Sequence, residues 1–398
     1  MTILYIHQYF CTPKESGATR SFWISKELID RGHKVIMICS TNRNHPKEGI
    51  EIIDGIEVHY IKNEYTNYMS KPAKIKSFLR FVYKSIKEAK RQKDIDLVFA
   101  TSTPLTVGAV ALELKRHKKW PFIFEVRDLW PEFPIQIGAV KNRYLIKLLK
   151  AFERKIYRKS NHVIALSPGM RDGVMKAGIE PEKVSMVPNM SKPDEFFPRE
   201  HNKEIMSKYN LTEETFKIVH FGSMGVANGL EYIIETARIL DERGVGNIEF
   251  IFVGDGATLP KLKRLVEEYG LKSVKFLGYQ NMSTVSEIVN LCDLSITSFK
   301  NLPILQTNSP NKLFDSLSAG IPIVVNSAGW TKDIVENENC GFYVDPEKPE
   351  DFADKIVSYK DNAEKLKEWR ENARRLSIEK FDKDLLAKKV AMIIETHA

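Results

Sequence analysis

The chain lacks the features that define several protein classes. No apolar run approaches the roughly 20 residues of a membrane-spanning helix, and the N-terminus enters a strand-like segment with no basic leader or cleavage pattern. Only four cysteines occur in 398 residues. They lie far apart, which predicts buried reduced thiols rather than disulfides or a metal site. Internal repeats and low-complexity tracts are also absent. These absences disfavour membrane-spanning, disulfide-stapled and solenoid proteins, and they predict a cytoplasmic location.

Charge is unevenly distributed along the chain. The net charge is +8, yet residues 1–200 carry 35 Lys and Arg against 22 Asp and Glu, whereas the remainder carries 25 against 30. A basic first half implies an anionic partner for that half, either nucleic acid or the anionic lipids of the cytoplasmic leaflet. Few aromatic residues are interleaved with the basic ones and no nucleic-acid-binding motif is present. We therefore expect an anionic inner-leaflet membrane surface as partner and no nucleic acid.

The order of apolar segments predicts an α/β protein with two domains. Short β-branched runs alternate with helical patterns, first over residues 1–190 and again over residues 191–379. A turn-rich stretch at 188–194, PNMSKPD, separates the two series. We expect two doubly wound parallel sheets that face a cleft holding the ligand. An amphipathic helix at 383–394 has no strand after it.

Two loops of the first half are candidate ligand contacts. Gly17 and Arg20 follow the first predicted strand, where they could approach and pair an anionic ligand or form an ordinary tight turn with a surface arginine. Arg127, Asp128 and Trp130 follow the strand predicted at 122–126. Residues at the carboxyl end of a parallel strand are placed for catalysis or substrate binding, although Arg127 and Asp128 could equally form a structural ion pair.

The helix predicted at residues 74–93 is amphipathic and basic. Its apolar positions recur every three or four residues, and they are Ile75, Phe78, Leu79, Val82 and Ile86. The pattern fits a helix that touches a membrane surface, or a helix packed on its sheet with a solvated basic face. The basic bias recurs at 115–119 and 141–159.

The stretch from 305 to 329, LQTNSPNKLFDSLSAGIPIVVNSAG, is the strongest local signal. It predicts a polar loop, a helix from Asn311 to Ala319 that ends at Gly320, and a buried strand at 321–325. The backbone N–H groups at the helix start, together with Lys312, form a phosphate seat. Asp315 lies one turn further along. Glycine turns at Gly222 and Gly254 also follow predicted strands and let backbone approach a ligand.

Taken together, these motifs resemble a retaining glycosyltransferase of family 4 with the GT-B arrangement of two Rossmann-like domains. The matching segments come in the family's order over nearly the whole chain, and they are RGHKVIMIC, VPN, FGSMGVANGLE, FVGDG, VKFLGY, SPNKLFDSLSAGIPIVV, SAGWTKDIV and NCGFYVDPEKPEDFA. RDLWPE and SPNKLF resemble the branch that builds bacterial surface polysaccharides and includes fucosamine transferases.

The resemblance implies metal-independent transfer of a sugar, with retention, from a nucleotide diphosphate. The donor is expected to be a UDP-sugar, with an N-acetylated amino sugar as one option, and the acceptor a lipid-linked saccharide of O-antigen or capsule at the inner face of the membrane. No cofactor beyond the donor is expected. The alternative is a UDP-sugar epimerase of the same fold. The implied donor-binding residues are Gly222, Ser223, Asn228, Gly254, Gly278, Tyr279, Thr307, Ser309, Asn311, Lys312, Leu313 and Asp315.

The chain departs from the family pattern at several positions. Asp315 stands at the second glutamate of the Glu-seven-Glu motif, and Thr307 replaces the first. Ser223 and Asn228 stand where the family has Arg and Lys, so charge compensation would rest on Lys312 with Arg127 or Arg20. Asp128 is the candidate for orienting the acceptor or the reacting sugar. The resemblance also implies that a C-terminal helix at about 380–398 packs on the first domain.

Overall fold

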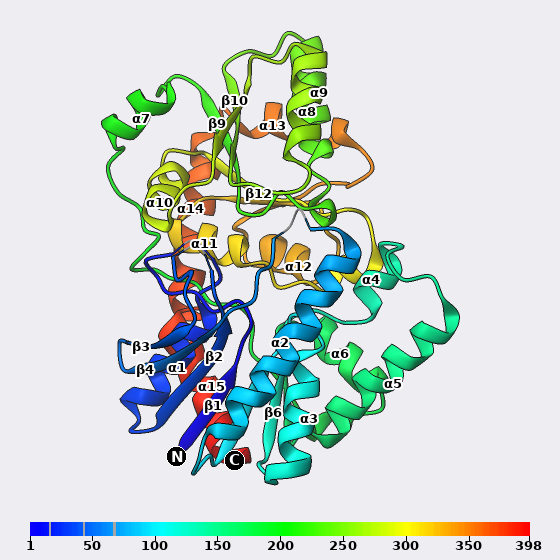
Figure 1. Cartoon of the computed structure of the whole chain (residues 1–398). Coiled ribbons are helices and arrows are strands. Elements are labelled where there is room, and N and C mark those ends of the chain that lie inside the picture. The colour runs from blue at the N-terminus through cyan, green and yellow to red at the C-terminus, as the bar shows by residue number, and fades with distance from the viewer. Residues whose placement is uncertain (16, 43, 67–68) are drawn as a thin grey trace. The chain divides into compact units, whose positions relative to one another are not determined.

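The computed structural model describes residues 1–15, 17–42, 44–66 and 69–398. The chain divides into two compact units. Unit 1 contains Met1–Pro188, Thr307–Ser309 and Lys383–Ala398, and unit 2 contains Asn189–Gln306 and Pro310–Asp382. Figure 1 shows the elements of both units along the chain.

Unit 1 is built on a parallel sheet. Across its described residues, eight strands lie in the order β3-β4-β2-β1-β5-β6-β7-β8, and only β3 is antiparallel to its neighbour. The strands are β1 (Thr2–Ile6), β2 (Lys34–Ser40), β3 (Gly49–Ile53), β4 (Ile56–Ile61), β5 (Leu97–Thr101), β6 (Phe122–Val126), β7 (His162–Ala165) and β8 (Val184–Met186). The four strands β1, β5, β6 and β7 are fully buried apart from the first residue of β1, as expected for a sheet covered on both faces.

Helices cover both faces of this sheet. They are α1 (Arg20–Asp30), α2 (Lys71–Arg91), α3 (Val107–Lys118), α4 (Glu132–Gln136), α5 (Arg143–Lys159), α6 (Pro168–Lys176) and α15 (Lys383–His397). Right-handed crossovers in this strand order place α2, α3 and α5 on the face opposite α1. The C-terminal helix α15 packs on α1, and Glu395 binds both Arg31 and His33 at 2.9 Å.

The buried face of α2 differs from the sequence prediction. Its buried positions are Ser77, Phe81, Ser85 and Ala89, which recur every four residues. The predicted face contains Ile75 and Leu79, whose side chains are exposed. The other three predicted positions, Phe78, Val82 and Ile86, are half-buried, so the buried face is rotated from the predicted one where the helix packs on α3 and the sheet.

Unit 2 contains a second parallel sheet. Within the part of unit 2 that the structure describes, six strands lie in the order β11-β10-β9-β12-β13-β14. They are β9 (Phe216–Phe221), β10 (Ile248–Val253), β11 (Val274–Gly278), β12 (Leu294–Thr297), β13 (Ile323–Val325) and β14 (Gly341–Tyr343). The helices are α7 (Lys203–Tyr209), α8 (Glu231–Glu242), α9 (Leu259–Tyr269), α10 (Met282–Asn290), α11 (Asn311–Ala319), α12 (Trp330–Asn337), α13 (Pro349–Tyr359) and α14 (Ala363–Glu379). The predicted pair of Rossmann-like parallel sheets is confirmed.

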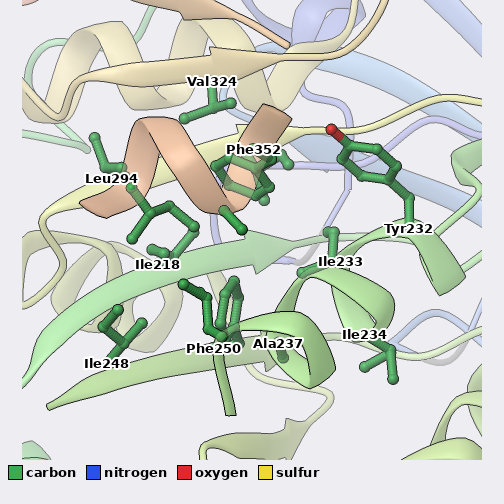
Figure 2. Close-up of a cluster of buried hydrophobic side chains, with 14 of the residues drawn as sticks. Ile218, Tyr232, Ile233, Ile234, Ala237, Ile248, Phe250, Leu294, Val324 and Phe352 are labelled. Carbon is green, nitrogen blue, oxygen red and sulfur yellow. The ribbon is translucent and has the colours of Figure 1, made fainter. Parts of the chain in front are cut away.

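A hydrophobic core in unit 2 packs against β9 and β10, the strands that precede Gly222 and Gly254. Figure 2 shows Ile233 and Ala237 of α8 gathered with Ile218 of β9, Phe250 of β10 and Phe352 of α13. Each of these side chains is at most 1% exposed. Burying a large apolar side chain contributes roughly 1.5–3 kcal/mol, so this cluster holds β9 and β10 in register.

Two strands were not predicted from the sequence. β3 is an edge strand whose residues are almost all exposed, so it carries no inside–outside alternation. β14 has only three residues, too few for a periodic signal. Among the described residues, no helix is both long enough and apolar enough to cross a bilayer.

Candidate functional site

The carboxyl ends of three neighbouring strands bring polar residues together in unit 1. His7 follows β1, Ser102 follows β5 and Arg127 follows β6. The Arg127 guanidinium Nη1 lies 3.3 Å from His7 Nε2, and the Arg127 backbone N–H donates to Ser102 Oγ at 3.0 Å. These three strands are adjacent in the sheet, so residues that are far apart in the sequence form one cluster at its edge.

The neutral imidazole of His7 holds Arg127 in place. A guanidinium can only donate, so His7 Nε2 accepts from Arg127 and the hydrogen of the ring lies on Nδ1, which donates to Ser21 Oγ at 2.8 Å. Burial, reinforced by the charge of Arg127, lowers the pKa of His7 well below its ordinary value. The imidazole therefore stays neutral at physiological pH and fixes the direction of the arginine.

Asp128 lies in the same cluster and is held by a hydroxyl. Thr103 Oγ1 donates to Asp128 Oδ2 at 2.7 Å. Burial raises the pKa of Asp128, and the opposing effects of the Thr103 hydrogen bond and the Arg127 charge only partly offset it. Arg127 and Asp128 are not joined as the ion pair that the sequence left open, because Arg127 bonds His7 and Asp128 bonds Thr103.

Arg20 occupies a structural position. Its side chain is 1% exposed, Nε donates to Glu125 Oε1 at 2.9 Å, and the two terminal nitrogens donate to the carbonyls of Pro188 and Val187. Glu125 is itself fully buried and accepts from Thr101 Oγ1 at 2.5 Å. The expectation that Arg20 pairs a ligand anion therefore needs correction, because the guanidinium compensates a buried carboxylate inside the sheet.

The two other first-half candidates have contacts within their own segments. A Cβ on Gly17 would lie 2.7 Å from Cys11 Sγ, so this glycine is required by the packing of its own loop. The Trp130 ring is partly buried and lies 6.5 Å from the Phe133 ring, and the backbone N–H of Trp130 donates to the Asp128 carbonyl at 3.1 Å. Trp130 thus lies directly beside Asp128 along the chain.

In unit 2, Lys312 is a cation without a carboxylate partner. It lies in the first turn of α11, and Nζ is 3.2 Å from Nε2 of His220 at the end of β9. Among the described residues, no Asp or Glu oxygen forms an ion pair with it, and burial lowers the pKa of Lys312 to about 7. Burial and the charge of Lys312 lower the pKa of His220 well below its usual value, so His220 accepts as a neutral ring.

The start of α11 has the geometry that the sequence predicted. The helix runs from Asn311 to Ala319, Pro310 precedes it, and Gly320 ends it with φ of 64°. The Leu313 N–H donates to the Pro310 carbonyl at 3.1 Å. The first helical turn carries the positive end of the dipole, and Lys312 adds its charge at that end.

Asp315 lies one turn further along α11 and is paired with Lys192. The carboxylate Oδ1 is 2.9 Å from Lys192 Nζ, and both side chains are less than a tenth exposed. Burial raises the pKa of Asp315, and the charge of Lys192 opposes that rise. The carboxylate is therefore fixed in position and retains a second oxygen as a hydrogen-bond acceptor.

The glycine turns of unit 2 stack on one another. The Gly222 N–H donates to the Val253 carbonyl, and the Gly254 N–H donates to the Gly278 carbonyl, each at 2.8 Å. A Cβ on Gly254 would lie 2.0 Å from the Gly222 carbonyl oxygen, so Gly254 is required by loop packing rather than by a ligand. Gly222 has φ of 104°, and a Cβ there would meet only Lys312 at 3.9 Å. The turn at Gly222 is therefore open, and it lies beside Lys312.

The remaining predicted donor residues lie in several separate segments. Ser223 is exposed, and Tyr279 is 50% exposed after β11. Asn228 caps its own turn, because its Oδ1 accepts from the Gly225 N–H at 3.1 Å. Thr307 and Ser309 belong to unit 1, where the Thr307 carbonyl accepts from the Ser167 hydroxyl.

Several residues of these clusters were not identified from the sequence. They include His7, Ser102, Thr103, Lys192 and His220. His220 stands near the carboxyl end of a predicted strand, which is the same signal that singled out Asp128, whereas the first strand was predicted to continue past His7 and ends before it at Ile6. Lys192 lies in the segment read as a linker, and its contact with Asp315 depends on residues far apart in sequence.

Comparisons with known proteins agree with this architecture. Residues 19–194 match the family model described as Glycosyltransferase Family 4, and residues 201–376 match Glycosyl transferases group 1. The chain is 24% identical over 224 residues to alpha-D-kanosaminyltransferase of Streptomyces kanamyceticus, covering 54% of this chain and 55% of that protein. It is also 24% identical over 258 residues to alpha-galactosylglucosyldiacylglycerol synthase of Streptococcus pneumoniae, covering 63% of this chain and 65% of that one. The chain thus spans between half and two thirds of these relatives.

A solved structure extends the likeness to the whole fold. HepE of Anabaena, in complex with UDP and glucose, superposes with a TM-score of 0.74 at 18% identity and covers 100% of both chains. At this identity the comparison establishes the GT-B fold alone. The two family models together span nearly all of the sequence, on the two sheets described above. The chain belongs to glycosyltransferase family 4.

Proposed function

We propose that this protein transfers a sugar from a nucleotide diphosphate, in the first instance a UDP-sugar, to a lipid-linked saccharide with retention of configuration. The observation that carries the proposal is Lys312, a mostly covered cation at the start of α11 with a neutral histidine as its neighbour and no carboxylate partner among the described residues. A buried charge of this kind is costly unless a ligand supplies the opposite charge. A diphosphate does so.

The same residues fit the chemistry of the donor. Negative charge develops on the diphosphate as the bond to the sugar breaks, and a fixed ammonium and a helix N-terminus stabilise that charge more in the transition state than in the ground state. Gly222 lets the backbone come close beside Lys312. Asp315, held by Lys192, accepts a hydrogen bond from a ribose hydroxyl through its remaining oxygen.

In unit 1, Arg127 and Asp128 act on the acceptor or the reacting sugar. The imidazole of His7 directs Arg127, and the hydroxyl of Thr103 directs Asp128. We assign no general base to the protein, because in front-face attack with retention the leaving phosphate takes the proton of the acceptor hydroxyl. A contact from Arg20 is not part of the proposal, since its guanidinium is buried against Glu125.

Three further observations support the substrate classes. HepE was solved with UDP and glucose, and the S. pneumoniae relative is named as a glycolipid synthase. The first 200 residues carry a charge of +13, which favours an acceptor at an anionic membrane surface. From the RDLWPE and SPNKLF segments, we propose that the donor carries an N-acetylated amino sugar and that the product belongs to O-antigen or capsule.

A thermal-shift screen of nucleotide sugars tests the donor half of this proposal. A ligand at about 100 times its Kd stabilises the native state by about 2.7 kcal/mol, a shift of several degrees in Tm. We expect a shift with UDP-sugars that Lys312→Ala abolishes, while Lys263→Ala on α9, an exposed lysine, preserves it. A protein that responds to no nucleotide sugar would overturn the assignment. Epimerisation of a UDP-sugar in the absence of acceptor would replace the transferase with the epimerase.

A further inference from the structure

The first half of α5 presents large apolar side chains to solvent. Tyr144 is 74% exposed, Leu145 is 43% exposed and Leu148 is 66% exposed. Of the helix residues, only Ile156 and Tyr157 near its C-terminal end are buried, so the helix is anchored to unit 1 at that end. Three large apolar residues exposed within five positions form a contiguous patch rather than isolated surface residues.

The apolar patch is surrounded by positive charge. Residues 143–159 contain seven Lys and Arg and a single acid, Glu153. That acid is turned away from solvent, because the Tyr157 hydroxyl donates to Glu153 Oε1 at 3.1 Å and burial raises the pKa of Glu153 to about 7. The exposed surface of α5 therefore carries cations and no exposed carboxylate.

A second patch of the same kind lies on α2. Ile75, Leu79 and Tyr83 are 58%, 60% and 70% exposed and recur every four residues, so they form one stripe along the helix. Lys76 and Arg80 are exposed beside them. Both α2 and α5 pack against α3 on the same face of the sheet of unit 1 (Figure 1). The helices α2 and α5, which lie in one layer, thus each expose apolar side chains with cations beside them.

We propose that α5, assisted by α2, docks unit 1 on an anionic lipid bilayer. Leucine and tyrosine side chains insert at the level of the headgroups, and the flanking Lys and Arg pair with lipid phosphates, which is how a basic amphipathic helix lies in an interface. A second copy of the chain is a poor occupant, because two such helices would bring like charges together. Nucleic acid is also a poor occupant, since four of the six exposed apolar side chains are leucine or isoleucine, which offer no stacking surface. This inference deepens the proposed function. It rests on that function in one respect, which is the lipid-linked acceptor.

Vesicle flotation with the full chain tests the docking surface. The probes are phosphatidylcholine vesicles with and without phosphatidylglycerol, at low salt and at high salt. We expect binding that requires phosphatidylglycerol and weakens with salt. Replacing Leu145 and Leu148 together by Asp should weaken binding at least tenfold, since the loss of each buried leucine alone is worth roughly tenfold in affinity.

A matched control distinguishes this patch from exposed apolar residues in general. Ile50 and Ile52 of β3 are 61% and 68% exposed on an edge strand flanked by acids, so their joint replacement by Asp should leave flotation unchanged. All variants should keep the Tm shift with a UDP-sugar, which separates docking from donor binding. Three results would overturn the proposal: wild-type protein that does not float with anionic vesicles, a Leu145/Leu148 variant that floats like wild type, or a wild-type dimer that the same variant dissociates.

Discussion

The pKa of Lys312 makes the donor affinity depend on pH in a specific way. Burial lowers this pKa from 10.5 to about 7 in the free protein, so about half of the molecules carry a neutral amine at pH 7. A bound diphosphate favours the ammonium and returns the pKa toward its ordinary value. Binding therefore takes up a proton above pH 7, and affinity falls by up to about tenfold for each further pH unit. Between pH 7 and about pH 8.5 the expected loss is roughly fifteenfold.

Isothermal titration calorimetry measures both quantities. A nucleotide sugar is the right ligand, because each of its phosphates carries one ester and one anhydride linkage, so neither titrates in this range. Titrations between about pH 6 and 8.5, in two buffers with different ionisation enthalpies, give the affinity and the number of protons taken up. We expect nearly one proton per ligand at about pH 8. Affinity that is flat across this range, with no proton uptake, would show that the ammonium does not face the diphosphate.

Lys312→Met extends the same argument to stability. Because the native pKa lies below the unfolded one, the charged lysine destabilises the fold at and below pH 7, and the penalty disappears as pH rises toward 10.5. Methionine keeps an unbranched side chain of similar length without the charge. The variant should raise the unfolding free energy of the ligand-free protein at pH 7, by at most about 4 kcal/mol, while the Tm shift with UDP-sugar is lost. Methionine at the exposed Lys263 should change neither quantity. A destabilised Lys312→Met protein would contradict the reasoning.

Three other predictions follow from the same structure. Burial raises the pKa of Glu153 from 4.5 to about 7, so its stability penalty is absent below pH 4.5, grows as pH rises from 4.5 to 7 and is complete above pH 7; Glu153→Gln should raise the unfolding free energy at pH 8 by up to about 3 kcal/mol in urea melts, with little gain at pH 4.5. Asp128→Asn should reduce transfer at least a hundredfold, roughly the contribution of one positioned catalytic group, while the UDP-sugar Tm shift persists; transfer at the wild-type rate would remove Asp128 from the mechanism. Gly254→Ala places a Cβ 2.0 Å from the Gly222 carbonyl, so it should lower stability by about 2–4 kcal/mol and weaken donor binding, whereas Gly278→Ala, which meets no atom within 4 Å, should cost only its positive φ, about 1–2 kcal/mol.

Sequence reasoning located helix α11 well. The stretch around Lys312 combines a proline before the helix, a glycine after it and a β-branched strand, and each of these is a local signal. The helix accordingly runs from Asn311 to Ala319 as predicted. Asp128 was identified by the equally local rule that parallel strands end at a ligand edge.

The errors arose where the role of a residue depends on distant partners. Arg20 was a plausible ligand contact until the fold placed Glu125 of β6 beside it and buried both. Gly254 suggested a ligand approach, yet the atom that approaches it is the Gly222 carbonyl. For α2, more than one stripe shares the helical period, and the packing of the helix on α3 and the sheet decides which of them is buried.

The sequence by itself determined the alternation of strands and helices, the two-sheet architecture and the position of helix α11, because period, capping and turn chemistry are encoded within a few neighbouring residues. Tertiary structure alone decided which charges are satisfied. Arg20 and Asp315 acquired partners from remote segments, whereas Lys312 acquired only a neutral histidine. The free energy of a charged group depends on everything packed around it, and that environment forms only when the sheets assemble.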